Sequence, residues 1–247
     1  MPIRRFLALL ALAVCLALPA AAQKRRSVRF TPPAAPPTGG CHTFGLVQAG
    51  LQASYLTTTP SGNVTFTITW ISDTPTRTHT TQKVTTPQGT ADAETILDGE
   101  IVGTLRALKH FWVKTTTTVA VIGKLTTEVD VDYVPSLAAG PAGGWCVGAT
   151  WNVPPSTQTI STRPSIGPPT TITNNTIASQ GEVLAVGAVV TVPAGIFNTV
   201  KYRGVTVSGT GAQVAITWVS MDYNIVVKQD TIDAAGNVTS VTTLTDM

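Results

Sequence analysis

Apolar and polar residues alternate most clearly just after the turn sequence at 60–62. Val64, Phe66, Ile68 and Trp70 are separated by three threonines. Successive side chains of an extended chain point to opposite faces, so the four apolar residues would share one face. The pattern predicts an antiparallel strand that buries one face and leaves the threonines on the other.

Residues 112–134 predict a hairpin. Two alternating segments flank Gly123 and Lys124, and glycine in the first position suits a tight primed turn. In the second segment we expect inward and outward side chains to alternate: Val129, Val131 and Tyr133 inward, Glu128, Asp130 and Asp132 outward.

Between these segments lies a stripe with helical spacing. Its members recur every three or four residues: Leu97, Ile101, Leu105, Leu108 and Trp112. This spacing predicts one helix within 90–112. Thr90 or Asp92 would cap it, and Gly99 and Gly103 would weaken it.

The middle of the chain is rich in proline and glycine. Residues 135–144 and 152–169 are interpreted as loops, and the segment 153–170 is a candidate connection between two halves. Between the two loops lie Trp145, Cys146 and Trp151. These residues indicate a structural segment that is held in place.

Strands resume after residue 177. We expect them at 183–192, 197–207, 212–220, 223–232 and 237–244, with the last hairpin turn at 233–237. The predicted fold is therefore mainly β: a curved antiparallel sheet or half-barrel of about nine to eleven strands with one helix packed on it, in a single domain over 41–247.

The N-terminal residues indicate export. Arg4 and Arg5 precede an apolar run over 6–18, and Pro-Ala-Ala-Ala follows at 19–22. This is the pattern of a signal peptide over 1–22 with cleavage after Ala22, which places the protein in the periplasm or outside the cell. An uncleaved anchor is the alternative, but the apolar run is short for a membrane span.

A basic, proline-rich segment follows at 23–40, and we expect it to be a poorly ordered leader. Its cations would favour an anionic surface: Lys24, Arg25, Arg26 and Arg29. Beyond this leader two cysteines remain, Cys41 and Cys146. In an oxidising compartment they predict one disulfide, and two separate buried thiols are the alternative.

The charge balance argues against nucleic-acid binding. Six of the 16 basic residues precede residue 30, which leaves ten against 13 acidic residues in the rest of the chain. A nucleic-acid interface needs clustered lysine and arginine, which this part of the chain lacks.

No motif for catalysis or metal binding stands out. The chain has no G-x-S-x-G sequence, and its three histidines are far apart. We therefore predict no catalytic residues, no metal and no cofactor. The candidate ligand-binding residues are aromatic: Phe66, Trp70, Trp112, Tyr133, Phe197, Tyr202 and Trp218. They either fill the core or, if the sheet stays open, line a concave apolar pocket.

Two motifs near the C-terminus carry a resemblance. The first is Pro193, Gly195 and Phe197, and the second is Trp218 followed by Val227 and Lys228. Together they resemble uncharacterised secreted bacterial β-rich proteins with a curved sheet like that of the periplasmic (Lol-type) lipoprotein carriers. The resemblance covers the last quarter of the chain, and Asn224 stands where that pattern has glycine. It implies a concave sheet that cradles an apolar group or a protein segment.

The predicted function is thus a non-enzymatic binding protein of the cell envelope. Its partner would be an apolar small molecule, a lipid or an envelope protein. A structural or adhesive surface module acting through sheet edges is the first alternative. A hydrolase is the second, and it would require a buried histidine–carboxylate pair beside a serine or threonine.

Overall fold

The computed structural model describes residues 40–86, 89–119, 123–208 and 211–247. The predicted signal peptide over 1–22, the cations of the leader and all of the leader except residue 40 lie outside the described residues. Within the described part, no helix is long and apolar enough to cross a membrane.

The described residues form fourteen strands. Their bounds are β1 Cys41–His42, β2 Gln52–Thr59, β3 Gly62–Asp73, β4 Arg77–Thr86, β5 Gly89–Val102, β6 Leu105–Val119 and β7 Gly123–Pro141. The second half contains β8 Trp145–Cys146, β9 Thr150–Pro164, β10 Thr170–Val192, β11 Gly195–Ser208, β12 Gly211–Ser220, β13 Val226–Ile232 and β14 Val238–Asp246.

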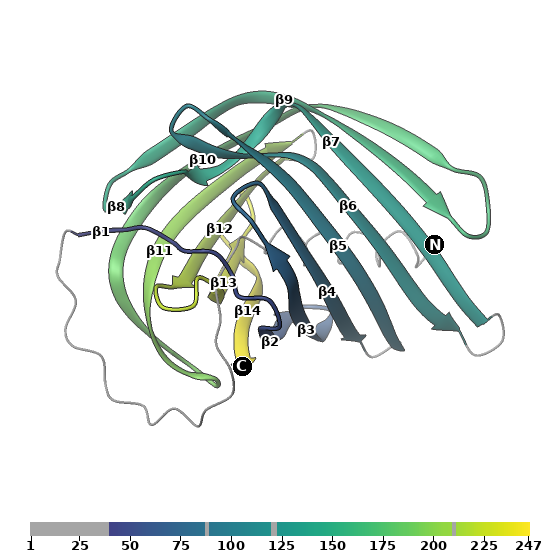
Figure 1. The fold of residues 1–247 in the computed structure, drawn as a ribbon, viewed down its shortest axis with the longest axis horizontal. Helices are drawn as coiled ribbons and strands as arrows, with labels where there is room; N and C mark the ends of the chain where they lie inside the picture. The colour runs from purple at the N-terminus through teal and green to yellow at the C-terminus, as the bar shows by residue number, and fades with distance from the viewer. Residues whose placement is uncertain (1–39, 87–88, 120–122, 209–210) are drawn as a thin grey trace.

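Twelve of these strands form a closed barrel (Figure 1). From β2 onward each barrel strand pairs antiparallel with the next one along the chain, with β7 pairing directly with β9. The series continues through β10 to β14, and β14 then pairs with β2 to close the ring. The remaining strands, β1 and β8, form a separate two-stranded sheet.

The prediction of a mainly β fold with a curved antiparallel sheet is confirmed, but the count of nine to eleven strands is too low. The predicted helix is wrong. Residues 90–112 form most of the β5–β6 hairpin, and Gly103 has a φ of 61° at its turn. The helical stripe is a coincidence, because the inward residues follow the alternation of strands: Ala91, Ala93 and Thr95, then Phe111 and Val113.

The two predicted loops are also largely strand. β7 runs to Pro141, and residues 153–164 belong to β9, which forms a hairpin with β10. Proline and glycine therefore lie within long strands here. The register of β10 shifts twice against β9, between Asn174 and Ser179, so this part of the ladder is irregular.

Other local predictions are confirmed. Val131 and Tyr133 are buried, while Asp130 and Asp132 make ion pairs outside. The turn predicted at 60–62 joins β2 to β3, which begins at Gly62, and residues 233–237 connect β13 to β14.

The barrel interior contains three clusters of buried apolar residues. The largest lies on the β2–β3 and β12–β14 side and includes Phe66, Trp70 and Phe197. A second surrounds Trp145 and Trp151, and a third includes Phe111 and Tyr133. The inner face is partly polar, since Thr80, Gln82 and Thr95 are almost fully buried. The chain's own side chains therefore occupy part of the barrel interior.

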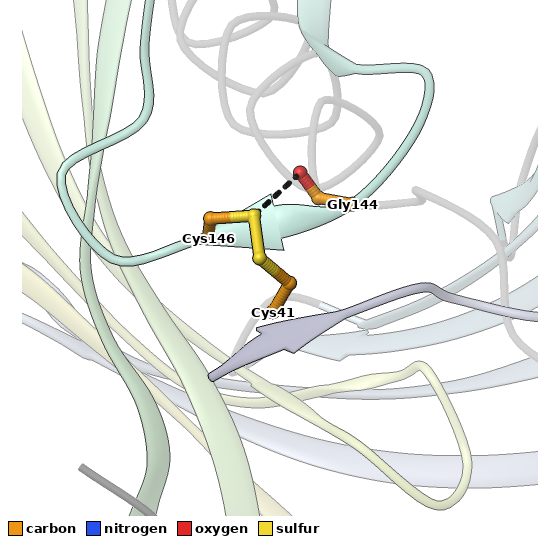
Figure 2. The surroundings of a disulfide bond; sticks show 3 residues. All are labelled: Cys41, Gly144 and Cys146. Atoms are coloured by element: carbon orange, nitrogen blue, oxygen red, sulfur yellow. Dashed lines mark hydrogen bonds between the residues drawn. A yellow bond between two sulfur atoms is a disulfide. The ribbon is translucent and has the colours of Figure 1, made fainter. Parts of the chain in front are cut away.

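The predicted disulfide is present. Cys41 in β1 and Cys146 in β8 are bonded across a sequence separation of 105 residues. Figure 2 shows that the bond joins the two short strands, with the Cys146 sulfur 3.7 Å from the carbonyl oxygen of Gly144. It ties the start of the described chain to the segment between β7 and β9.

Candidate binding pocket at the mouth of the barrel

The chain connects neighbouring strands alternately at the two ends of the barrel. One end holds the β3–β4, β5–β6, β7–β9, β10–β11 and β12–β13 connections, and we call it the mouth. Residues 41–47, which we call the strap, are held against this end. After the strap, residues 48–51 lead into β2, which begins at the same end.

Three fixed points hold the strap. The Cys41–Cys146 disulfide anchors its start. The side-chain amide of Asn224 then donates to the carbonyl oxygen of Gly45 at 3.0 Å. Val47 finally donates its backbone N–H to Asp73 Oδ2 at 2.8 Å. These contacts come from β8, the β12–β13 connection and the end of β3, so the strap is fixed across several strands.

Aromatic rings gather beneath the strap. The ring of Trp145 lies 5.4 Å from Phe44, 5.6 Å from Trp151 and 5.1 Å from Tyr202, measured between centroids. The arrangements are edge-on or tilted, which is the favourable geometry for aromatic pairs. One residue of the strap, one of β8, one of β9 and one of β11 therefore pack as a single cluster.

Two glycines make room for the tryptophans. A Cβ placed on Gly140 would lie 2.7 Å from the Trp145 ring, and one on Gly181 would lie 2.0 Å from the Trp151 ring. Gly181 is also the cross-strand partner of Trp151. Both rings thus lie directly on backbone, which no other residue type would permit without displacement.

A pocket opens beside this cluster and has a cavity volume of about 40 Å³. Its walls are Phe44, Arg106, Gly140, Pro141, Ala142, Gly143, Trp145, Tyr202, Val219 and Asn224. That volume holds about three water molecules. The pocket in this conformation therefore admits an aromatic ring edge or a short alkyl group, rather than a whole lipid.

The electrostatics of the mouth depend on three titratable groups. Burial raises the pKa of Asp73, and the hydrogen bonds from Thr78 and Val47 and the charge of Arg106 oppose this. Burial lowers the pKa of His42, which the charge of Asp222 and a hydrogen bond to the Met221 backbone oppose. Burial also raises the pKa of Tyr202, with an opposing hydrogen bond from Thr217. The mouth thus holds a neutral phenol and, separately, a carboxylate that accepts hydrogen bonds from two donors.

The structure places the seven candidate aromatic residues in three different environments. Tyr202 alone among them lines the pocket. Phe66, Trp70, Phe197 and Tyr133 are buried in the apolar clusters. Trp112 and Trp218 lie on the outer face, because their neighbours in sequence point inward. The expectation that these two face inward is therefore wrong, and the ammonium groups of Lys201 and Lys228 lie 4.9 and 4.7 Å from the Trp218 ring centre.

The remaining pocket residues were not among the candidates. Phe44 follows Cys41 by three residues, and Trp145 precedes Cys146 directly. Once the two cysteines are paired, both aromatic residues are brought to the same place, so the cysteine pair was the signal that pointed to this site. Arg106 was assigned to a helix, and its position beside Gly140 follows only from the β6–β7 register.

Two histidine–carboxylate pairs lie on the outer face, away from the pocket. His79 Nε2 is 2.9 Å from Glu94, and His110 Nδ1 is 2.8 Å from Asp132. Asp130 also contacts Arg163. Among the described residues, no group of three or more histidine, cysteine or acidic side chains is arranged to hold a metal ion.

Comparisons with family models, curated proteins and solved structures gave no match to this chain. The geometry of the mouth is therefore the basis for a functional assignment.

Proposed function

We propose that this chain is an exported, non-enzymatic binding protein that holds an apolar group of its ligand in the mouth pocket. The observation that carries the proposal is the pocket itself, where Phe44, Trp145 and Tyr202 offer apolar surface next to a few polar groups. Binding sites for small molecules commonly combine such a lining with a small number of placed polar side chains.

Three further features support export and envelope location. The disulfide suits an oxidising compartment. The sequence pattern of residues 1–22 is that of a signal peptide. The basic residues of the leader would add affinity for an anionic surface, at ~1 kcal/mol per cation near such a surface.

The alternatives have less support. An adhesive module would need a long unpaired strand edge, whereas all twelve described barrel strands are paired on both sides. A hydrolase would need a buried histidine–carboxylate pair, and the pairs formed by His79 and His110 lie on the outer face. The resemblance to lipoprotein carriers remains a hypothesis, and the small pocket favours one apolar group over a whole acyl chain.

Native mass spectrometry of the protein purified from its own host tests the proposal. We expect an adduct that is lost on mild unfolding. An Ala142→Trp variant, which fills the pocket from its loop, should carry much less adduct. Ala235 is exposed in the β13–β14 turn, so Ala235→Trp is the matched control and should keep the adduct. Equal adduct in both variants would place the ligand elsewhere, and no adduct on the wild-type protein would count against the proposal.

A further inference from the structure

The described lining of the pocket contains one cation. Of its ten residues, Arg106 alone carries a charge. The residue is half-buried in β6, next to Gly140 of β7 in the sheet register. A guanidinium in such a place interacts more strongly with an anion than one in bulk water, because solvent screens it less.

Arg106 is not neutralised by a direct ion pair. Among the described residues no carboxylate lies within 4.0 Å of it, whereas Arg77 and Arg163 both contact carboxylates. The charge of Arg106 does act on Asp73, because burial raises the pKa of that carboxyl group and the charge of Arg106 opposes this rise. The oxygens of Asp73, however, accept hydrogen bonds from Val47 N at 2.8 Å and Thr78 Oγ1 at 2.6 Å.

The other polar groups of the lining are engaged. The Asn224 amide donates to the strap at Gly45, and the Tyr202 hydroxyl is hydrogen-bonded to Thr217. The charged donor of the described lining is Arg106, whose planar fork matches the two oxygens of a carboxylate.

We infer that the mouth pocket takes a small organic carboxylate, whose charged end pairs with Arg106 and whose apolar body packs against Phe44, Trp145 and Tyr202. This inference rests on the proposed function and adds the ligand class. The cavity volume of about 40 Å³ limits the enclosed part to a few atoms, so an aryl or short alkyl carboxylate fits better than a long-chain one.

A pair of probes of nearly equal shape tests the inference: 4-fluorobenzoate and its neutral counterpart 4-fluorobenzamide, followed by ¹⁹F NMR titration. We expect the wild-type protein to bind the benzoate at least ten times more tightly than the benzamide, since hydrogen bonds to charged groups are the stronger ones. Arg106→Gln should remove this preference. Arg203→Gln is the matched control, because Arg203 is exposed on the outer face, and it should leave the preference unchanged.

The outcomes distinguish a failure of the carboxylate inference from a failure of the proposed function. The carboxylate inference would be overturned if the wild-type protein bound both probes equally, or if Arg106→Gln kept the full preference for the benzoate. Either result would still be consistent with an apolar binding pocket. Binding of neither probe would overturn the inference and would also count against the proposed function, which the adduct experiment tests separately. If Arg106→Gln does not fold, the salt dependence in the wild-type protein decides, because only benzoate binding should weaken as ionic strength rises.

Discussion

Removing the Cys41–Cys146 disulfide should destabilise the barrel strongly. The bond closes a loop across 105 residues, and the double variant Cys41→Ser/Cys146→Ser opens that loop in the unfolded chain. For a loop of this length the chain-entropy model gives a loss of about 4.7 kcal/mol. In a domain of roughly 200 residues this corresponds to a fall in Tm of about 9–19 °C.

Guanidinium unfolding followed by tryptophan fluorescence measures the effect, with the free energy extrapolated to water. Wild-type protein in reducing agent should behave like the double variant, and the variant itself should not respond to the reductant. A loss below ~1 kcal/mol would refute the reasoning, because the crosslink would then not constrain the unfolded chain as the entropy model requires.

Three further predictions concern the mouth. Gly140→Ala should cost about 1–3 kcal/mol in unfolding free energy, because the new methyl group meets the Trp145 ring. Gly143→Ala, whose Cβ would have open space, should change it by less than ~0.5 kcal/mol. Because the pKa of His42 is lowered in the folded protein, the unfolded chain protonates this histidine first as pH falls below 6.5. The free energy of unfolding should therefore be lower at pH 5.5 than at pH 7.5, as measured by denaturation curves. His42→Gln should reduce this difference. Asn224 has a φ of 50°, which alanine adopts unfavourably. Asn224→Ala should therefore lower the free energy of unfolding, measured with a chemical denaturant, by about 1–3 kcal/mol. Asn224→Gly, which tolerates that φ, should cost only the hydrogen bond to the strap, about 1 kcal/mol, and equal losses would contradict this explanation.

The sequence was sufficient to predict a strand where the residues that point into the barrel are apolar. The alternation at 64–70 and 129–133 identified strands correctly, and the cysteine pair identified the disulfide. Asn224 stands where the resembled pattern has glycine, and it has a positive φ, which asparagine adopts more readily than most residues.

Prediction failed where polar residues point inward. β4 places Thr78, Thr80 and Gln82 inside the barrel, so its sequence shows no apolar alternation. β5 offers mostly small inward residues such as Ala91 and Ala93, and Leu97 joined residues of both faces in a helical stripe by coincidence. Local pattern alone cannot distinguish these cases, because sheet pairing decides them.

The pocket could not be predicted from the sequence for a related reason. Its walls come from the strap, β6, the β7–β8 region, β11, β12 and the β12–β13 connection. Only the register and closure of the barrel bring these segments together. Aromatic residues were the right type to consider, but strand parity placed Trp112 and Trp218 outside and left Tyr202 at the site.

The tryptophan side chains offer the most direct test of the central claim that the mouth pocket binds an apolar group. The chain has five tryptophans, so an ¹H–¹⁵N spectrum should contain five indole N–H signals. On titration with 4-fluorobenzoate and with 4-fluorobenzamide, we predict that the signal of Trp145, in the pocket wall, shifts with at least one of them. The signals of Trp112 and Trp218, on the outer face, should stay in place. Shifts confined to those two outer residues, or no shift at Trp145 with either probe, would contradict the account.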